Sequence, residues 1–337
     1  MAVISPQDKV RMKIAGLLPH MEVWGGVRRY LELGNELIRK GHNFIIYTPE
    51  GKPPVWLEFK GQTRPFSQLF KEQHDVAICS EYSLLPQFQA LSSRVKFFYF
   101  VLAGHRWEKI VVRQPYRFLA NSSGLSRRIE KRYRVRCEVA AGGINPDLFY
   151  PLVSDRPGNE FRVLCYGRLY RRRKGIQRVV RAVEKLHRKY PRVKLLLFDS
   201  PVEGEKRDPR ELLQTSIPYE FFWNLPQTSL AWMYSQADIF VSAERRAGWS
   251  NPTAEAMACG VPVICTPSGT EDFAIPNQTA IVVRWPLPFI LKREIEKIMR
   301  AEDLRRRLSL AGRQKILEFT WSSLADRLEK IFTAALV

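Results

Sequence analysis

The sequence has few cysteines, and none lies in a pattern that binds metal or builds a disulfide framework. The five cysteines of this 337-residue chain form no CxxC pair and no even set. Most lie in apolar stretches, where a small buried thiol is the ordinary state, and this usage fits a reducing cytoplasm. There is also no Asp-x-Asp pair and no cluster of histidines and cysteines, so the sequence implies no metal ion and no other cofactor.

Long hydrophobic segments are lacking too. The run VKFFYFVLAG, at 95–104, is about half of the roughly 20 apolar residues that a membrane span needs. The first residues lack the order of positive charge, apolar stretch and small-residue cleavage site that marks a signal peptide. We therefore expect a cytoplasmic protein, with peripheral attachment to the inner face of the membrane as an option.

Acidic residues are scarce relative to basic ones. The chain has 34 Asp and Glu against 54 Lys and Arg, which gives a formal net charge of +20. Such a charge attracts polyanions, whether nucleic acid, anionic lipid or phosphorylated substrates. A general compositional bias is the simpler alternative. No recognised nucleic-acid motif accompanies the charge, so nucleic acid is the least favoured of these partners.

Strand-like and helix-like segments alternate along the whole chain, which predicts α/β domains with parallel sheets covered on both faces. The length favours two domains. The stretch GGINPDLFYPLVSDRPGNE, at 142–160, is rich in Pro, Gly and Asp and shows no periodicity, so we place one domain over 1–150 and a second over 151–318. Two such Rossmann-like domains would hold a ligand cleft at the carboxyl ends of their strands.

The expected strands are those whose apolar runs end in turn residues: 13–18, 43–48, 75–80, 95–101, 117–122, 161–167, 193–200, 238–243 and 261–266. The clearest helical periods cover 27–40, 122–136 and 176–190.

A pair of glycines, Gly25 and Gly26, stands between the first expected strand and the helix expected from Val27. Glycine there lets the backbone approach a ligand closely, and a helix start offers free N–H groups. A purely structural turn explains the pair equally well. The pattern is not GxGxxG, so a dinucleotide-binding site gains little support.

Two cations follow the first strand of the second domain. Arg168 and Lys174 lie in GRLYRRRKG, directly before a helix. A guanidinium and an ammonium at the carboxyl end of a strand suit a diphosphate, whose charge grows as its bond to a sugar breaks. The alternative is that basic residues of this segment form a solvated turn, and we prefer this interpretation for Arg171, Arg172 and Arg173.

A single carboxylate, Glu255, lies near the start of a short helix. Ser250 or Asn251 can cap this helix, Pro252 fits its first turn and Gly260 ends it. Among its small neighbours, a carboxylate could accept hydrogen bonds from two ribose hydroxyls. The alternative is an acid that stabilises the positive end of the helix, worth about 0.3–1 kcal/mol. The spacing does not decide between the two.

Taken together, these stretches resemble the family 4 glycosyltransferases, retaining sugar-nucleotide enzymes of the GT-B fold. That family shows Gly-Gly after its first strand, Asn-Gly-Val-Asp…Phe-x-Pro at the interdomain linker, Gly-Arg-Leu…Lys-Gly, and Glu-Gly-Phe followed by Pro and Glu-Ala-Met-Ala-x-Gly. The matching segments here are GG at 25–26, GGINPDLFYP at 142–151, GRLYRRRKG at 167–175 and AGWSNPTAEAMACGVPV at 247–263. The closing FTWSSLADRLEKIF also resembles the family's last helix, so residues 319–337 are expected to return to the first domain.

The resemblance implies a role for each matching residue. Arg168 and Lys174 would hold the diphosphate of the donor, and Glu255 would hold the ribose hydroxyls. The backbone of Gly248, Trp249 and Ser250 would face the sugar and phosphate. The matches in the first domain are looser: Gly25 and Gly26 would face the donor diphosphate, and His105 would contact the transferred sugar, with His20 as an alternative.

The main departure from the family is Ala247, which stands where the first Glu of the spaced pair is expected. Losing one charged hydrogen bond to a sugar hydroxyl costs about 1.5–3 kcal/mol. Glu244, three residues earlier, could reach in its place. The spacer before Lys174 is also one residue longer than usual, so Arg173 could share the phosphate role. Glu271 is a further, weaker candidate.

The resemblance implies transfer of a hexose from a nucleotide-diphosphate sugar to a hydroxyl acceptor, a sugar or a lipid-linked molecule, in glycan or glycolipid synthesis. In a retaining reaction of this kind the departing diphosphate can itself take the acceptor's proton, so losing a Glu at Ala247 alters sugar choice more readily than it abolishes chemistry. The alternative is a weak or inactive GT-B-like protein that binds nucleotide sugars without transferring them.

The segment Ser122–Arg136 offers a place for part of the excess charge. Leu125, Ile129 and Tyr133 form one helical stripe, and the basic residues lie largely off it. This pattern is typical of an ordinary amphipathic helix that packs on a core. The sharper hypothesis is a surface held against anionic lipid, where a lipid-linked acceptor would lie.

Overall fold

The computed structural model describes residues 11–102, 104–153, 158–201 and 207–337. The chain divides into two compact units. The first runs to Asn121, continues over Leu125–Gly143 and includes Trp321–Val337, whereas the second contains Ser122–Gly124 and Ile144–Thr320.

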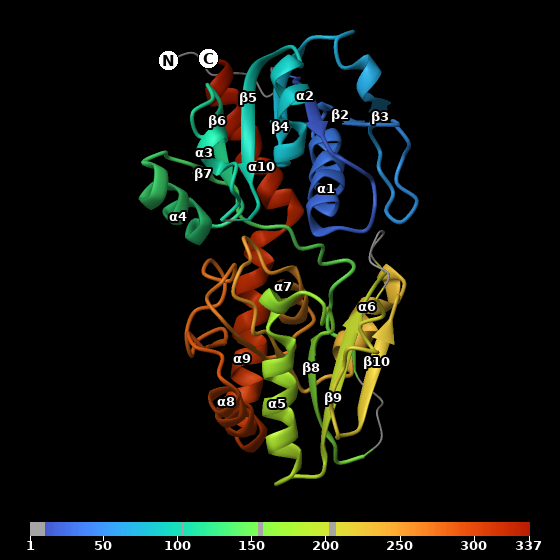
Figure 1. Ribbon diagram of the computed structural model, residues 1–337, viewed down its shortest axis with the longest axis vertical. Helices are drawn as coiled ribbons and strands as arrows, with labels where there is room; N and C mark the ends of the chain where they lie inside the picture. The colour runs from blue at the N-terminus through green and yellow to red at the C-terminus, as the bar shows by residue number, and fades with distance from the viewer. Residues whose placement is uncertain (1–10, 103, 154–157, 202–206) are drawn as a thin grey trace, which may run out of the picture. The chain divides into compact units, whose positions relative to one another are not determined.

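The first unit is built on a seven-stranded parallel sheet in the order β3-β2-β1-β4-β5-β6-β7 (Figure 1). Its strands are β1 (Lys13–Leu17), β2 (Asn43–Thr48), β3 (Gln62–Pro65), β4 (His74–Cys79), β5 (Ser93–Phe100), β6 (Arg117–Ala120) and β7 (Glu138–Val139). The helices of this part are α1 (Gly25–Arg39), α2 (Leu85–Ala90), α3 (Glu108–Val111), α4 (Ser123–Tyr133) and α10 (Trp321–Leu336), with short 3-10 turns at Phe66–Gln68 and Tyr82–Leu84.

Both faces of the first sheet are covered. The apolar stripes of α1 and α10 bury a shared core against one face, with Leu31, Leu324 and Phe332 among its members. The other face packs against α2 and α4, where Phe88 and Ile129 are almost completely buried. The final helix of the chain is therefore part of the core of the first unit.

The second unit holds a six-stranded parallel sheet in the order β10-β9-β8-β11-β12-β13. Its strands are β8 (Phe161–Tyr166), β9 (Val193–Asp199), β10 (Tyr219–Trp223), β11 (Ile239–Val241), β12 (Val263–Cys265) and β13 (Ile281–Val282). The helices are α5 (Ile176–His187), α6 (Leu230–Ser235), α7 (Asn251–Ala258), α8 (Pro288–Arg300) and α9 (Glu302–Ile316), with 3-10 turns at Arg172–Lys174, Gln227–Ser229 and Leu317–Phe319.

The two sheets share one strand order, to which the first sheet adds a seventh strand, β7, at its edge. In each, the first strand lies between the second and the fourth in chain order, so the connections reverse direction beside that strand. In a doubly wound sheet, ligands bind outside the carboxyl ends of the strands at this reversal. In the second unit the place to look is therefore the carboxyl ends of β8 and β11.

The expected fold class, two Rossmann-like parallel sheets, is confirmed, and the expected strands appear with ends shifted by a few residues. The first helix differs in its start: it begins at Gly25 instead of Val27, so the Gly-Gly pair forms its first turn. Four short strands were not expected, namely β3, β7, β10 and β13. All five cysteines are buried and free, and burial raises the pKa of Cys79, Cys165 and Cys265 to about 12.

Candidate functional site

Arg168 lies just after β8, as the sequence predicts, and it is already held by a carboxylate. Its Nε and Nη2 donate to Oδ1 of Asp199 at 3.0 and 2.7 Å. Asp199 ends the neighbouring strand β9, and its side chain is completely buried. A forked pair of this kind fixes the plane of the guanidinium. Arg168 is therefore oriented before any ligand arrives.

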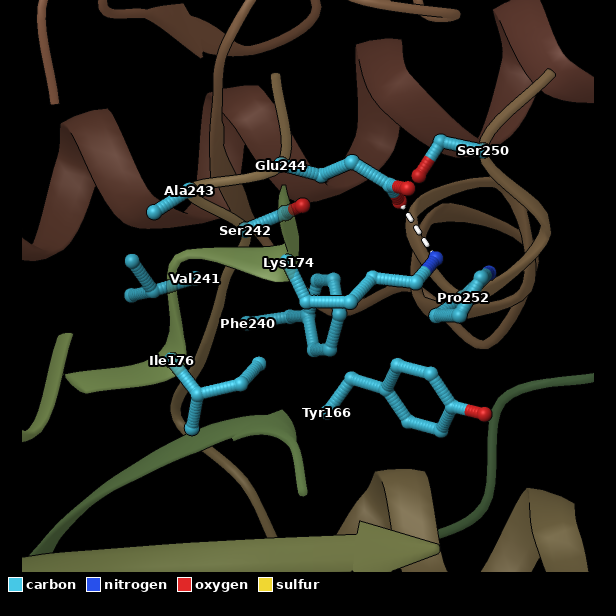
Figure 2. Close-up of a pocket in the computed structure, with 10 residues that line it drawn as sticks. All are labelled: Tyr166, Lys174, Ile176, Phe240, Val241, Ser242, Ala243, Glu244, Ser250 and Pro252. Atoms are coloured by element: carbon cyan, nitrogen blue, oxygen red, sulfur yellow. Dashed lines mark hydrogen bonds and ion pairs between the residues drawn. The ribbon is translucent and has the colours of Figure 1, made fainter. Parts of the chain in front are cut away.

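Lys174 ends the 3-10 turn before α5, and its ammonium forms an ion pair with Glu244, which follows β11 (Figure 2). Nζ of Lys174 donates to Oε2 of Glu244 at 2.7 Å. The side chains are only 17% and 6% exposed. Burial lowers the pKa of Lys174 from its ordinary value, and the Glu244 carboxylate acts in the opposite direction.

A glycine brings these two residues together. Gly175 follows Lys174 with φ +70°, and a Cβ at this position would lie 2.5 Å from the carbonyl oxygen of Ala243. The turn can therefore pack against the end of β11 only because residue 175 has no side chain. The backbone N–H of Arg245 also donates to the carbonyl of Arg173 at 3.0 Å, and the hydroxyl of Thr266 donates to the carbonyl of Glu244.

Tyr166, the last residue of β8, is a common neighbour of both cations. The guanidinium carbon of Arg168 lies 5.1 Å from the centre of its ring, and Nζ of Lys174 lies 5.3 Å from it. Such contacts attract the cations to the electron-rich face of the ring. Tyr166 therefore gathers the two positive groups at the carboxyl end of one strand.

A small cavity of about 10 Å³ lies at this point, close to the space that one buried water molecule needs. Its lining includes Tyr166, Lys174, Glu244 and Ser250. In Figure 2 the side chains of Lys174, Glu244 and Ser250 point toward one another. The cavity thus joins the carboxyl ends of β8 and β11 to the start of α7.

Helix α7 presents Glu255 much as the sequence predicts. Ser250 occupies the cap position, although its hydroxyl bonds Thr253 Oγ1 at 2.7 Å and forms no cap hydrogen bond. The hydroxyl of the buried Tyr234 donates to Oε2 of Glu255 at 2.8 Å. Burial, and then the Glu255 carboxylate, raise the pKa of Tyr234 well above its ordinary value, so Tyr234 remains a donor.

The loop before α7 is tied into the protein at both ends. The backbone N–H of Ala247 donates to Ser268 Oγ at 2.9 Å, and that of Ser250 donates to the carbonyl of Gly269 at 2.9 Å. The side chain of Trp249 is buried and packs on Phe273, with ring centres 4.7 Å apart. The Trp249 side chain therefore belongs to the core of the second unit.

The predicted residues Gly25, Gly26, His20 and His105 belong to the first unit. A Cβ at Gly26 would meet nothing within 4 Å, so packing does not require glycine there. His105 is exposed and stacks on Tyr82 with ring centres 4.1 Å apart and planes 11° apart. The backbone N–H groups of Gly104 and His105 donate to Oε1 of the buried Glu108 at 2.6 and 3.0 Å. His20 lies against Trp24.

Two weaker candidates lie outside the cavity. Arg173 and Glu271 are exposed, and neither lines it. Sequence reasoning missed three residues that hold the site together, Tyr166, Asp199 and Tyr234. The first two end buried strands beside the site, which is a signal that could have found them, whereas Tyr234 lies in a helix that gave no such signal.

Two further properties of the described residues concern the binding of a metal ion and the crossing of a membrane. Among the described residues, no group of three His, Cys, Asp or Glu is placed to hold a metal ion. In the same part of the chain, no helix combines the length and apolar character that crossing a membrane requires.

The second half of the chain matches a known family. Residues 151–315 match the family model described as "Glycosyl transferases group 1". A "GDP-mannose-dependent alpha-mannosyltransferase" of Mycolicibacterium smegmatis is 31% identical over 134 residues, which are 38% of this chain and 34% of that protein. A "D-inositol 3-phosphate glycosyltransferase" of Corynebacterium jeikeium is 26% identical over 213 residues, 58% of this chain and 51% of that protein. The matched regions thus span between a third and about half of these relatives.

Solved structures resemble the chain over almost its whole length. Sucrose-phosphate synthase from Thermosynechococcus elongatus superimposes with a TM-score of 0.77 at 19% identity and covers 96% of this chain and 99% of its own. Anabaena HepE in complex with UDP-glucose gives a TM-score of 0.74 at 15% identity and covers 96% and 100%. At such identities the likeness concerns the fold alone, and it agrees with the two-domain GT-B fold.

Proposed function

We propose that the protein is a glycosyltransferase that moves a hexose from a nucleotide-diphosphate sugar to an acceptor hydroxyl, with retention and without a metal ion, in glycan or glycolipid synthesis. One observation carries the proposal: Arg168 and Lys174 are gathered on Tyr166 at the strand reversal of the second sheet. The segment that holds them is the one that matches the glycosyl transferases group 1 family.

In this proposal the two cations stabilise the departing diphosphate, the group on which negative charge develops as the sugar bond breaks. The diphosphate takes the proton of the acceptor hydroxyl on the same face, which gives retention without a protein nucleophile. Glu255 accepts hydrogen bonds from the ribose, and the backbone of Gly248, Trp249 and Ser250 faces the phosphate and sugar. From the first unit, Gly25 and Gly26 approach the diphosphate and His105 contacts the transferred sugar.

The direct test is a thermal-shift screen with UDP-, GDP-, ADP- and dTDP-sugars, repeated with Lys174→Ala and Glu255→Ala. A true donor stabilises the wild type by mass action and loses that effect in both variants. Glu160→Gln is a matched control, because Glu160 pairs with Arg162 and Lys194 at the opposite end of β8. No stabilisation by any of these nucleotide sugars would contradict the proposal.

Turnover separates an enzyme from a binding protein. The donor found in the screen is incubated with sugar and lipid-linked acceptors in the presence of EDTA, and product formation or donor hydrolysis is followed. We expect transfer, with the anomeric configuration of the donor kept in the product. Binding without any turnover would favour the alternative of an inactive GT-B-like subunit.

We also propose that the basic face of α4 binds anionic lipid, where a lipid-linked acceptor would be presented. Leu125 and Ile129 are buried, whereas the basic side chains of the helix are exposed, namely Arg127, Arg128, Lys131 and Arg132. Charge alone attracts each such side chain to an anionic surface by about 1 kcal/mol. Co-sedimentation should therefore increase with the anionic lipid content of vesicles and weaken with salt, and independence of lipid charge would contradict it.

A further inference from the structure

Glu244 is an acid whose position suits the donor site, although the family pattern places no acid there. It follows β11, next to the strand reversal, and its carboxylate lines the cavity between Lys174 and Ser250 (Figure 2). Its side chain is only 6% exposed. A carboxylate so deeply buried is costly unless it is paired, and here its partner is the ammonium of Lys174.

The position at which the family carries its first Glu is occupied by Ala247 in this chain. Ala247 is 6% exposed, its N–H is bonded to Ser268, and its methyl group lies close to Gly269. Position 247 therefore holds a buried methyl group and no side-chain hydrogen-bond acceptor, whereas an acid lies three residues earlier. The backbone of Glu244 is fixed on both sides, by the Thr266 hydroxyl and by the bond between Arg245 and Arg173.

We propose that Glu244 is the sugar-side carboxylate of this site, a residue that accepts hydrogen bonds from hydroxyl groups of the donor sugar and thereby determines which sugar is transferred. The inference rests on the proposed function, because it assumes that Lys174 holds the donor diphosphate. The Glu244 carboxylate lies 2.7 Å from that ammonium. With the diphosphate held by Lys174, it would therefore be within reach of the bond between phosphate and sugar. It repels the phosphate oxygens, but it is a strong acceptor for neutral hydroxyls on the sugar side of the bond.

The same placement gives Glu244 a second effect, on Lys174 itself. Removing one partner of a buried pair leaves the other charge uncompensated, so a neutral residue at 244 disturbs Lys174 as well. A test must therefore separate contact with the sugar from support of the ammonium. Support acts through the diphosphate, which the nucleotide sugar and the nucleoside diphosphate share, whereas contact depends on the hydroxyl groups of the sugar.

The experiment measures dissociation constants by calorimetry for the nucleotide sugar identified in the screen and for the corresponding nucleoside diphosphate. The proteins are the wild type, Glu244→Gln and the control Glu160→Gln. Glu244→Gln is expected to weaken the nucleotide sugar about tenfold to a hundredfold more than the nucleoside diphosphate, as loss of a charged hydrogen bond predicts. Glu160→Gln should change neither ligand.

A series of deoxy-sugar donors then identifies the contact. In the wild type, binding weakens when the donor lacks the hydroxyl group that donates a hydrogen bond to Glu244. In Glu244→Gln, removing the same hydroxyl group has little further effect on binding. This non-additivity is the signature of a direct interaction. Deoxygenation effects that are the same in both proteins for every hydroxyl would overturn the inference.

Each other outcome is also decisive. If Glu244→Gln loses the same affinity for the nucleotide sugar and for the nucleoside diphosphate, Glu244 only supports Lys174. If it binds both ligands more tightly, the Glu244 carboxylate competes with the phosphate for the Lys174 ammonium. Either result overturns the inference while the proposed function stands. A wild type that binds neither ligand overturns the proposed function, and this inference with it. Unfolding curves without ligand establish that the Glu244→Gln protein is folded.

Discussion

The methyl group of Ala247 lies directly against Gly269. A Cβ added at Gly269 would stand 2.7 Å from Cβ of Ala247 and 3.1 Å from the carbonyl carbon of Gly248, and φ at Gly269 is +74°. The loop before α7 and the loop after β12 thus touch through a position that only glycine fits.

Gly269→Ala is therefore expected to destabilise the second unit by about 2–4 kcal/mol, from overpacking and from the left-handed backbone. Ala247→Gly removes the closest contact, so the double variant should recover part of the loss, measured by urea denaturation. Equal effects of Gly269→Ala in the two backgrounds would show that the two positions do not interact.

Gly26 and Gly34 lie on the same helix and are expected to respond in opposite ways to the same change. A Cβ at Gly26 meets nothing within 4 Å, whereas one at Gly34 would lie 2.8 Å from the rings of Phe44 and Phe59. Gly26→Ala should stabilise the protein by about 0.5 kcal/mol, because alanine favours a helix, and Gly34→Ala should destabilise it by about 1–3 kcal/mol.

The transfer assay tests whether Gly26 also has a role in catalysis. If the backbone at Gly26 approaches the donor, Gly26→Ala lowers kcat/KM while raising Tm. Such a combination separates a functional glycine from a structural one. A Gly26→Ala protein that is more stable and fully active would contradict the role proposed for the Gly-Gly pair.

The sequence predicts where the two cations of this site lie better than it predicts which carboxylates pair with them. Buried strands are recognised in the sequence as apolar runs, and residues that follow such strands lie together at one edge of a parallel sheet. The positions of Arg168 and Lys174 could therefore be predicted. Their partners could not, because Asp199 and Glu244 are 31 and 70 residues away along the chain. Which carboxylate meets which cation depends on strand order and turn geometry.

The same limit explains the strand that the sequence did not predict at Tyr219–Trp223. β10 is an edge strand whose side chains are exposed or half-buried, so YEFFW lacks the continuous burial that identifies β8 and β9. It also lacks the strict alternation of apolar and polar residues that identifies a half-buried strand. The family pattern drew attention to Ala247 and left Glu244 as a possible substitute three residues earlier. The three-dimensional arrangement is what places Glu244, and not Ala247, in the lining of the cavity.

Glu296 connects α8 to the end of α5, and its contribution to stability should depend on pH. Its Oε1 accepts from Lys189 Nζ and from the Tyr190 hydroxyl, both at 2.8 Å. These hydrogen bonds, the one from Lys189 first, lower the pKa of Glu296 from 4.5 to about 2. The folded protein therefore binds fewer protons than the unfolded chain between these values, and stability rises with pH there.

Glu296→Gln should cost about 0.5–1 kcal/mol near pH 7, a small value because Lys189 is 55% exposed and solvent screens the pair. The cost should persist down to about pH 4.5 and disappear as the pH falls toward 2. Glu294→Gln is the control on the same helix, because Glu294 pairs with the exposed Arg293 beside it. Denaturation curves at several pH values would contradict the prediction if the two variants behaved alike.

Lys174 should make nucleotide binding sensitive to alkaline pH. Burial lowers its pKa from the ordinary 10.5, so it loses its charge at a lower pH than an exposed lysine does. Only the charged form attracts a diphosphate, hence affinity should fall as the pH rises through the lowered pKa. Lys174→Arg keeps its charge throughout, so its affinity should depend less on pH, whatever its absolute value.

The measurement is the affinity for the nucleoside diphosphate above about pH 8, where its phosphates are fully ionised. Titration of the ligand is common to all proteins, so the difference between wild type and Lys174→Arg isolates Lys174. Lys189→Arg is the control, because the hydrogen bond to Glu296 raises the pKa of Lys189 and keeps it charged in this range. Identical pH profiles for wild type and Lys174→Arg would mean that the Lys174 ammonium does not contact the diphosphate, and the role proposed for it would be wrong.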